Sequence, residues 1–148
     1  MRISVKGRYA LAAVTVIAQN FQSNANVTVN SISETLGISK IYLEQVFAQL
    51  KREKLLLSIK GPNGGYQLSR PPQKITAWEV LAALETSLML NTENTVSEDA
   101  PEIETAMQLL VFKPLNTAVA ECLKNVTVRD LADLADKQQT QRAFMMNM

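Results

Sequence analysis

Side chains that can hydrogen-bond to the edges of base pairs lie along residues 39–54, a segment whose apolar spacing predicts a helix. The face of this helix that we expect to be buried holds Leu43, Val46, Phe47 and Leu50. The opposite face carries small, polar and basic side chains, namely Ile41, Gln45, Ala48 and Arg52, with Glu44 and Gln49 at its edges. A DNA major groove, about 12 Å wide, admits a helix with such a face.

Each residue type on this outward face suits a particular contact. Gln45 can pair with N7 and N6 of adenine, Glu44 can accept from N4 of cytosine, and Ile41 can meet a thymine methyl group. Basic side chains in and beside the helix can contact phosphates: Lys40, Lys51, Arg52 and Lys54. Taken singly, each side chain is also typical of a solvated surface, so the prediction depends on their joint placement.

The preceding segments predict the elements that would position this helix. A first helix is expected over residues 4–20, and a second over Val29–Leu36 with Thr28 as its N-cap. Gly37 can adopt the left-handed backbone that ends the second helix, and Ser39 can cap the third. Two helices joined by a tight turn that contains glycine are typical of a helix-turn-helix.

A β-hairpin is predicted directly after the third helix, from strands at Leu55–Ile59 and Tyr66–Leu68. Three of the five glycines of the chain lie in the loop between them. A hairpin at this place is typical of a wing, with Lys60 at a narrow minor groove or its phosphates and with Gly61, Gly64 and Gly65 allowing close approach of the backbone. A nucleotide-binding loop is the alternative, but the loop lacks the GxxxxGK[ST] spacing and no helix follows it.

The charge is divided between the two halves of the chain, although its net value is only +1. Residues 1–74 hold ten Lys and Arg against three acidic residues, a net charge of +7, and residues 75–148 have a net charge of −6. This division indicates a first half that binds a polyanion and a second half with another task, unless it arose by chance. Lys6 and Arg8, early in the first helix, are expected to add contacts to the DNA backbone.

The second half predicts further helices and a surface for a second copy of the chain. Thr76 can cap a helix from Ala77 to about Glu85, and a short helix is expected over residues 102–111. A longer helix is predicted to start near Pro114, since proline is accepted in a first turn. Its broad apolar stripe favours a helix-to-helix dimer contact over packing within one subunit, and the stripe consists of Leu115, Ala118, Val119, Cys122, Leu123 and Val126. A last short helix, capped by Thr127, is expected over Val128–Ala135. We therefore divide the chain into a winged helix-turn-helix domain (1–85), a variable connection (86–113), the dimerisation and C-terminal helices (114–136) and a tail without assigned structure (137–148).

The composition argues against an enzyme. The chain has no histidine and one cysteine, so that Ser-His-Asp triads, Cys-His pairs and imidazole metal sites are excluded, although carboxylate or lysine chemistry remains open. The single cysteine, Cys122, suits a reducing cytoplasm; we expect it to be a small buried apolar side chain, with a redox switch as the alternative. No apolar run reaches the roughly 18 residues of a membrane span. We expect no cofactor.

Four stretches together resemble the Rrf-two family of bacterial winged-helix regulators over roughly residues 1–135. They are Arg2–Ala10, Ile38–Gln45, Lys60–Tyr66 and Val126–Leu131, of which Tyr42-Leu43-Glu44-Gln45 and Gly64-Gly65-Tyr66 are the most specific. The resemblance implies a long helix that crosses its twofold mate, formed here by Leu115–Val126. It also implies that Ser39, Tyr42, Glu44 and Gln45 face the major groove, and that Lys60 stands where members often have arginine.

The chain departs from one branch of that family. Members that bind an iron–sulfur cluster have three cysteines in the segment corresponding to about residues 86–112, and this segment has none here. The chain therefore resembles the cluster-free members, such as regulators of cysteine metabolism. The sequence predicts a mainly α fold with a β-hairpin wing. It also predicts a cytoplasmic homodimer that binds double-stranded DNA as a repressor. The effector molecule or partner protein to which the dimer would respond is not identified by the sequence. A winged-helix module that binds protein and not DNA is the alternative.

Overall fold

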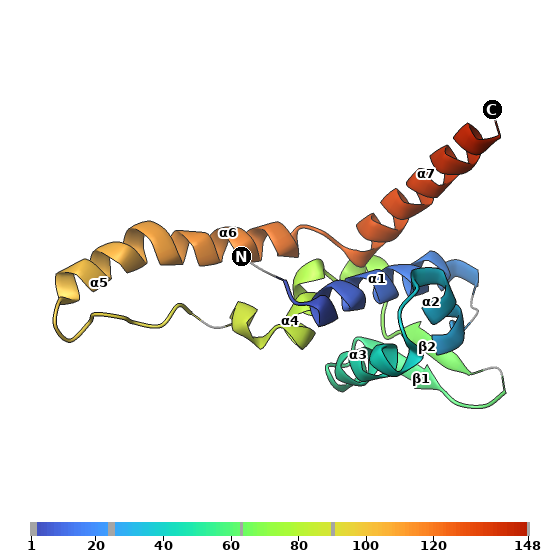
Figure 1. Cartoon of the computed structure of the whole chain (residues 1–148), viewed down its shortest axis with the longest axis horizontal. Helices are drawn as coiled ribbons and strands as arrows, with labels where there is room; N and C mark the ends of the chain where they lie inside the picture. The colour runs from blue at the N-terminus through green and yellow to red at the C-terminus, as the bar shows by residue number, and fades with distance from the viewer. Residues whose placement is uncertain (1–2, 24–25, 63, 90, 148) are drawn as a thin grey trace.

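The computed structural model describes residues 3–23, 26–62, 64–89 and 91–147, and within these ranges it is mainly helical with one two-stranded antiparallel hairpin. The elements are α1 (Val5–Gln19), η1 (Phe21–Ser23), α2 (Val29–Leu36), α3 (Lys40–Arg52), β1 (Leu56–Ile59), β2 (Gly65–Leu68), η2 (Pro72–Lys74), α4 (Ala77–Leu84), η3 (Thr86–Met89), α5 (Pro101–Met107), η4 (Gln108–Phe112), α6 (Lys113–Lys124) and α7 (Val128–Met146). Figure 1 shows a body made of α1 to α4 and the hairpin, from which α5–α6 and α7 extend as two arms in different directions.

Hydroxyl side chains begin the helices as the sequence predicts. The Thr28 hydroxyl accepts from the Ser31 amide at 3.1 Å, and the Ser39 hydroxyl accepts from the Tyr42 amide at 3.2 Å. Thr76 and Thr127 cap α4 and α7, and each takes part in a reciprocal capping box. The bounds of α2 and the N-caps are therefore confirmed, because these signals are local.

One apolar core joins the first four helices and the hairpin. The α3 positions predicted to be buried are all fully enclosed, and Phe47 lies against the Tyr66 ring of β2 with a centroid distance of 4.6 Å. Val128 and Ala132 of α7 are also buried in this core and pack on α1. The beginning of α7 thus completes the N-terminal domain, which the sequence alone did not indicate.

The chain returns to the body at Thr127, beside the start of α4. The Ala77 amide donates to the Val126 carbonyl, and the Val128 amide donates to the Ile75 carbonyl, both at 2.8 Å. These bonds pair Thr76 with Thr127 as an isolated antiparallel bridge. The two capping boxes therefore stand side by side, and the α6–α7 junction is fixed to the first turn of α4.

The long arm differs from the predicted pair of separate helices. Helices α5 and α6 form one continuous rod, because the π-helical turn η4 joins them without a break. As predicted, Pro114 lies in the first turn of α6, which begins at Lys113; the π turn precedes it, and there the Lys113 amide donates to the carbonyl of Gln108, five residues earlier. A proline has no amide hydrogen, and a π turn beside it lets the helix continue without the usual bond.

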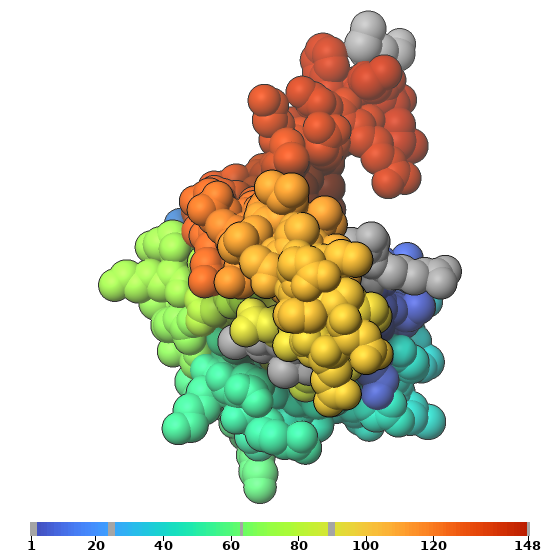
Figure 2. Space-filling model, turned by 90° about the vertical axis from the view of Figure 1, so that its left-hand side faces the viewer, coloured from blue at the N-terminus to red at the C-terminus, as the bar shows by residue number. Residues whose placement is uncertain are grey.

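The last helix is also longer than predicted. Helix α7 runs to Met146 instead of ending at Ala135, and so includes most of the tail that had no assigned structure. Its outer part stands clear of the body (Figures 1 and 2), and Phe144, Met145 and Met146 are exposed there. Among the described residues, no helix has the length and apolarity required to cross a lipid bilayer.

Candidate nucleic-acid interface

The turn between α2 and α3 is fixed by side-chain and backbone conformation. Gly37 has φ 68°, the left-handed backbone that the sequence predicted, and its amide donates to the Ser33 carbonyl at 2.8 Å. The Ser33 hydroxyl donates to the Ile38 carbonyl at 2.6 Å, across the turn. Since Ser39 caps α3 on the other side, the angle between the two helices is held from both ends.

The face of α3 opposite the core is open to solvent. Ile41 is 73% exposed, and Glu44, Gln45, Ala48 and Arg52 are also exposed. Within the described residues, the basic side chains of α3 take part in no ion pair, since the two ion pairs found there join Arg70 to Glu79 and Arg129 to Asp133. The predicted outward face is therefore accessible, and its cations are available to an anionic partner.

Tyr42 and Ser39 have structural contacts as well as predicted contacts with DNA. The Tyr42 ring is partly buried and lies edge-on to the ring of Tyr9 in α1, with a centroid distance of 5.1 Å. The Ser39 hydroxyl is already used as a helix cap. Lys6 and Arg8 are exposed in the first turns of α1, beside Tyr9, so these turns lie close to the start of α3.

The predicted hairpin is present, and its two strands pair with Leu56 opposite Leu68 and Ile59 opposite Gly65. Lys60 and Gly61 are exposed at its tip, and Gly61 has φ 111°, a conformation that favours glycine. Asn63, at the middle of the loop, lies outside the described residues.

Gly64 and Gly65 make close contacts inside the chain itself. A Cβ at Gly64 would overlap the Ile59 carbonyl oxygen, and a Cβ at Gly65 would lie 2.7 Å from the Val27 carbonyl oxygen. The latter crowding arises because Val27 pairs with Tyr66, the two residues exchanging hydrogen bonds of 2.8 and 3.3 Å. Val27 thus adds a third strand position to the hairpin. This position was not predicted, because a single residue between a loop and a helix cap has no strand periodicity.

Helix α3 and the wing lie on the same side of the body, at the bottom of Figure 1, while α6 and α7 occupy the other side. The hairpin begins directly from α3: the Leu55 amide donates to the Leu50 carbonyl at 2.9 Å, and Lys54 between them has a left-handed φ of 62°. The structure therefore brings together the two elements that were predicted to contact DNA.

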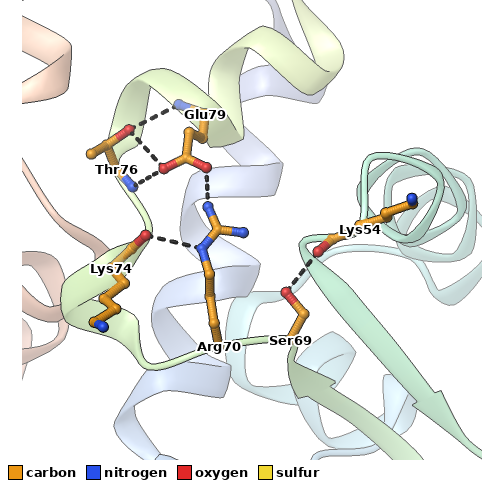
Figure 3. Close-up of polar contacts among 6 residues, drawn as sticks. All are labelled: Lys54, Ser69, Arg70, Lys74, Thr76 and Glu79. Carbon is orange, nitrogen blue, oxygen red and sulfur yellow. Dashed lines mark hydrogen bonds and ion pairs between the residues drawn. The ribbon is translucent and has the colours of Figure 1, made fainter.

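A polar network at the base of the wing was not predicted (Figure 3). The Ser69 hydroxyl donates to the Lys54 carbonyl at 2.6 Å, which ties the end of β2 to the start of β1. The Arg70 guanidinium pairs with the carboxylate of Glu79 in α4, and its Nε donates to the Lys74 carbonyl at 3.0 Å. The capping-box spacing of Thr76 and Glu79 was visible in the sequence, but it gives no sign of the arginine partner.

The apolar stripe of α6 is largely uncovered within one chain. Leu115 is 50% exposed, Ala118 and Cys122 are exposed, and Val119 and Leu123 are partly buried. Val126, the last residue of the predicted stripe, is also partly buried but lies beyond the end of α6. The expectation that Cys122 is buried is thus wrong for the single chain, in which its side chain is open to solvent. At the end of α6, the ammonium of Lys124 lies over the Trp78 ring of α4, 5.1 Å from its centroid.

One buried carboxylate organises the connection before α5. Glu104 is 5% exposed, and its Oε1 accepts from the amides of Thr95 and Val96 at 2.6 and 2.8 Å, while Gln108 donates to Oε2 at 3.0 Å. The Val96 amide, followed by the Thr95 amide and the Gln108 side chain, lowers the pKa of Glu104 against the opposing effect of burial. A cleft of about 490 Å³, lined mainly by polar side chains, lies between this connection and the α5–α6 rod.

Known proteins share this architecture. The Rrf2 (Rrf-two) family profile, described as "Iron-dependent Transcriptional regulator", matches residues 3–134. The HTH-type transcriptional regulator IscR of Sodalis glossinidius is 32% identical over 144 residues, covering 93% of this chain and 86% of that protein.

Solved structures agree with the sequence relatives. The structure of CymR (YrzC), the global cysteine regulator of B. subtilis, superposes with a TM-score of 0.76 at 31% identity, covering 90% of this chain and 98% of that one. IscR of T. potens gives a TM-score of 0.72 at 30% identity, with 94% and 91% covered. These relatives are winged-helix regulators and not enzymes. The chain belongs to the Rrf2 family of transcriptional regulators, with the DNA-binding winged-helix fold of that family.

Proposed function

We propose that the protein is a cytoplasmic homodimer that binds a pseudo-palindromic DNA operator through α3 and the wing, and represses transcription by occupying it. The observation that carries this proposal is the exposed face of α3, whose cations form no ion pair within the described residues, beside a wing on the same side of the body. In a dimer, two copies of α3 would enter major grooves whose centres lie roughly one helical turn, about 34 Å, or a multiple of it apart.

Sequence readout is assigned to the outward face of α3. Gln45 contacts an adenine, Glu44 a cytosine amine, and Ile41 a thymine methyl group. Phosphate contacts come from exposed basic side chains and from Ser39 and Tyr42 at the start of α3, which both also support the helix. The exposed basic side chains assigned to phosphates are Lys6, Arg8, Lys40, Arg52 and Lys60.

The dimer forms through the exposed stripe of α6. An apolar face that one chain leaves in solvent is stabilised when a second copy covers it, and a twofold axis lets the same residues serve both partners. Leu115→Asp would place a charge in that face and is expected to yield monomers in analytical ultracentrifugation. Thr117→Asp, on the opposite side of α6 and exposed, is the matched control and should stay dimeric. Equal behaviour of the two variants would contradict this interface.

The protein works without an iron–sulfur cluster, although the family profile is described as iron-dependent. The residues present do not fit such a group. The chain has one cysteine and no histidine, and the buried carboxylate Glu104 of α5 already accepts three hydrogen bonds with its two oxygens. Within the described ranges, no three or more acidic or cysteine side chains are grouped in a way that could hold a metal ion.

The test is selection of bound fragments from genomic DNA at low salt, followed by titration of the selected duplex with variants. Gln45→Ala is expected to weaken binding to that duplex by about 5- to 100-fold, the loss of one bidentate base contact, and to leave binding to random duplex unchanged. Gln138→Ala is the matched control, since Gln138 is exposed on α7, away from α3. A protein that selects no duplex would favour a protein-binding module instead. A reporter gene that stays silent only when the operator and the protein are both present would support repression.

A further inference from the structure

We infer that Arg70 and Glu79 are positioning residues for the wing, holding it at the angle at which Lys60 reaches DNA. This inference rests on the proposed function. Neither residue is on the outward face of α3 or in the wing loop, and neither is expected to touch DNA. The ion pair joins the segment leaving β2 to the first turn of α4 (Figure 3).

The geometry fixes the guanidinium at two points. One nitrogen pairs with the Glu79 carboxylate, and Nε donates to the Lys74 carbonyl at 3.0 Å. Glu79 is itself held, because its Oε1 accepts from the Thr76 amide at 3.2 Å in the capping box of α4. The end of the wing is thus attached to a helix terminus whose own conformation is fixed.

A second contact joins the other end of the hairpin to this one. The Ser69 hydroxyl, one residue before Arg70, donates to the Lys54 carbonyl just before β1. Both ends of the hairpin are therefore fixed at its base, while its tip at Lys60 and Gly61 is exposed to solvent. A small rotation at the base of a two-stranded hairpin moves the tip by a larger distance, so the base contacts determine where Lys60 lies relative to α3.

Helix α4 also contacts the arm that carries the proposed dimer surface. Its Trp78, adjacent to Glu79, lies under the Lys124 ammonium of α6, and the neighbouring Ala77 amide bonds to Val126 before α7. The Arg70–Glu79 pair therefore attaches the wing to the same helix turn that receives α6.

Glu79→Gln distinguishes a positioning role from a purely electrostatic one, since the two predict opposite changes in affinity for DNA. Glutamine can still accept from the Thr76 amide, so the capping box survives, but it can no longer pair as an anion with Arg70. Loss of a negative charge would by itself strengthen binding to DNA. If the pair positions the wing, Glu79→Gln instead weakens binding to the selected duplex, by about three- to tenfold. Asp133→Asn is the matched control, because it breaks the Arg129–Asp133 pair on α7 with the same change of charge, and it should bind like the parent protein or slightly more tightly.

A double-variant cycle with Lys60→Ala separates positioning from general destabilisation. In the parent protein Lys60→Ala weakens binding, whereas in the Glu79→Gln background the same change should cost less than about twofold, because Lys60 is already out of place. The variant Arg70→Gln/Glu79→Gln keeps the net charge of the parent protein and should show at least the loss of Glu79→Gln, because it lacks the electrostatic gain of the single variant. Binding of Glu79→Gln at or above the parent affinity, or an undiminished effect of Lys60→Ala, would overturn the inference. Failure of the parent protein to bind any duplex would instead overturn the proposed function.

Discussion

Replacing Gly65 with alanine tests the arrangement of the wing in detail. The new Cβ would lie 2.7 Å from the carbonyl oxygen and 2.9 Å from the carbonyl carbon of Val27, and 3.2 Å from the Cβ of Asn26. The nearest atoms belong to the backbone, so they cannot rotate away as a flexible side chain could. Val27 must therefore move, and its two hydrogen bonds with Tyr66 are lost or weakened.

The expected cost follows from those contacts. Each backbone hydrogen bond contributes about 0.5–1.5 kcal/mol net, and overpacking adds about 1–3 kcal/mol. We expect Gly65→Ala to lower the free energy of unfolding by about 2–6 kcal/mol. For a chain of this length, the melting temperature should fall by about 3 °C per kcal/mol, or roughly 6–18 °C in total.

Gly37→Ala is the control, because this glycine is favoured by its backbone conformation and not by close neighbours. Gly37 has a left-handed φ of 68°, but a Cβ added there would meet no atom within 4 Å, so the cost is conformational and about 1 kcal/mol. Circular dichroism melts at one fixed protein concentration measure both variants, since dimer stability depends on concentration. A Gly65→Ala protein that melts at or above the temperature of Gly37→Ala would refute the close packing of Val27 on the wing.

Three further predictions concern the core, the wing tip and the connection. Phe47→Ala should lower the free energy of unfolding by about 3–5 kcal/mol in urea denaturation, because the ring is fully buried; a loss below about 1 kcal/mol would contradict that burial. Lys60→Ala should weaken binding to selected and random duplex alike and reduce the slope of log affinity against log salt by about 1, so an unchanged slope would count against a phosphate contact. The pKa of Glu104 is lowered from 4.5 in the folded chain. The stability that the ionised carboxylate contributes is therefore complete above pH 4.5, and it is lost as the pH falls through the lowered pKa. Hydrogen exchange at the Val96 amide should therefore lose protection in acid, and in Glu104→Ala, which removes the acceptor, already at neutral pH; protection that is unchanged in the variant would exclude the anchor.

The parts of the fold that were predicted from the sequence depend on local chemistry. A hydroxyl at an N-cap and glycine in a left-handed turn act over three or four residues, so Thr28, Gly37 and Ser39 could be assigned from their spacing. The buried face of α3 followed from its period in the same way.

The parts that were missed depend on contacts between distant residues. Val27 becomes a strand position only because Tyr66 lies beside it. Arg70 pairs with Glu79 only because η2, between them, reverses the chain and brings the two side chains together. In the sequence Glu104 resembles any other acidic surface residue, because its two backbone amide donors, Thr95 and Val96, belong to a different segment. Pro114 was assigned correctly to the first turn of a helix, but the π turn before it, which joins α6 to α5 in one rod, was not predicted.

Photocrosslinking from position 41 tests most directly whether the outward face of α3 meets DNA bases. Ile41 is 73% exposed, so a photoreactive side chain placed there should not disturb the core. We expect it to attach to bases within each half of the selected operator, whereas the same group at Gln138 of α7 should give no attachment. Crosslinks from position 138 but not from position 41, in a complex that forms with the parent affinity, would contradict the account.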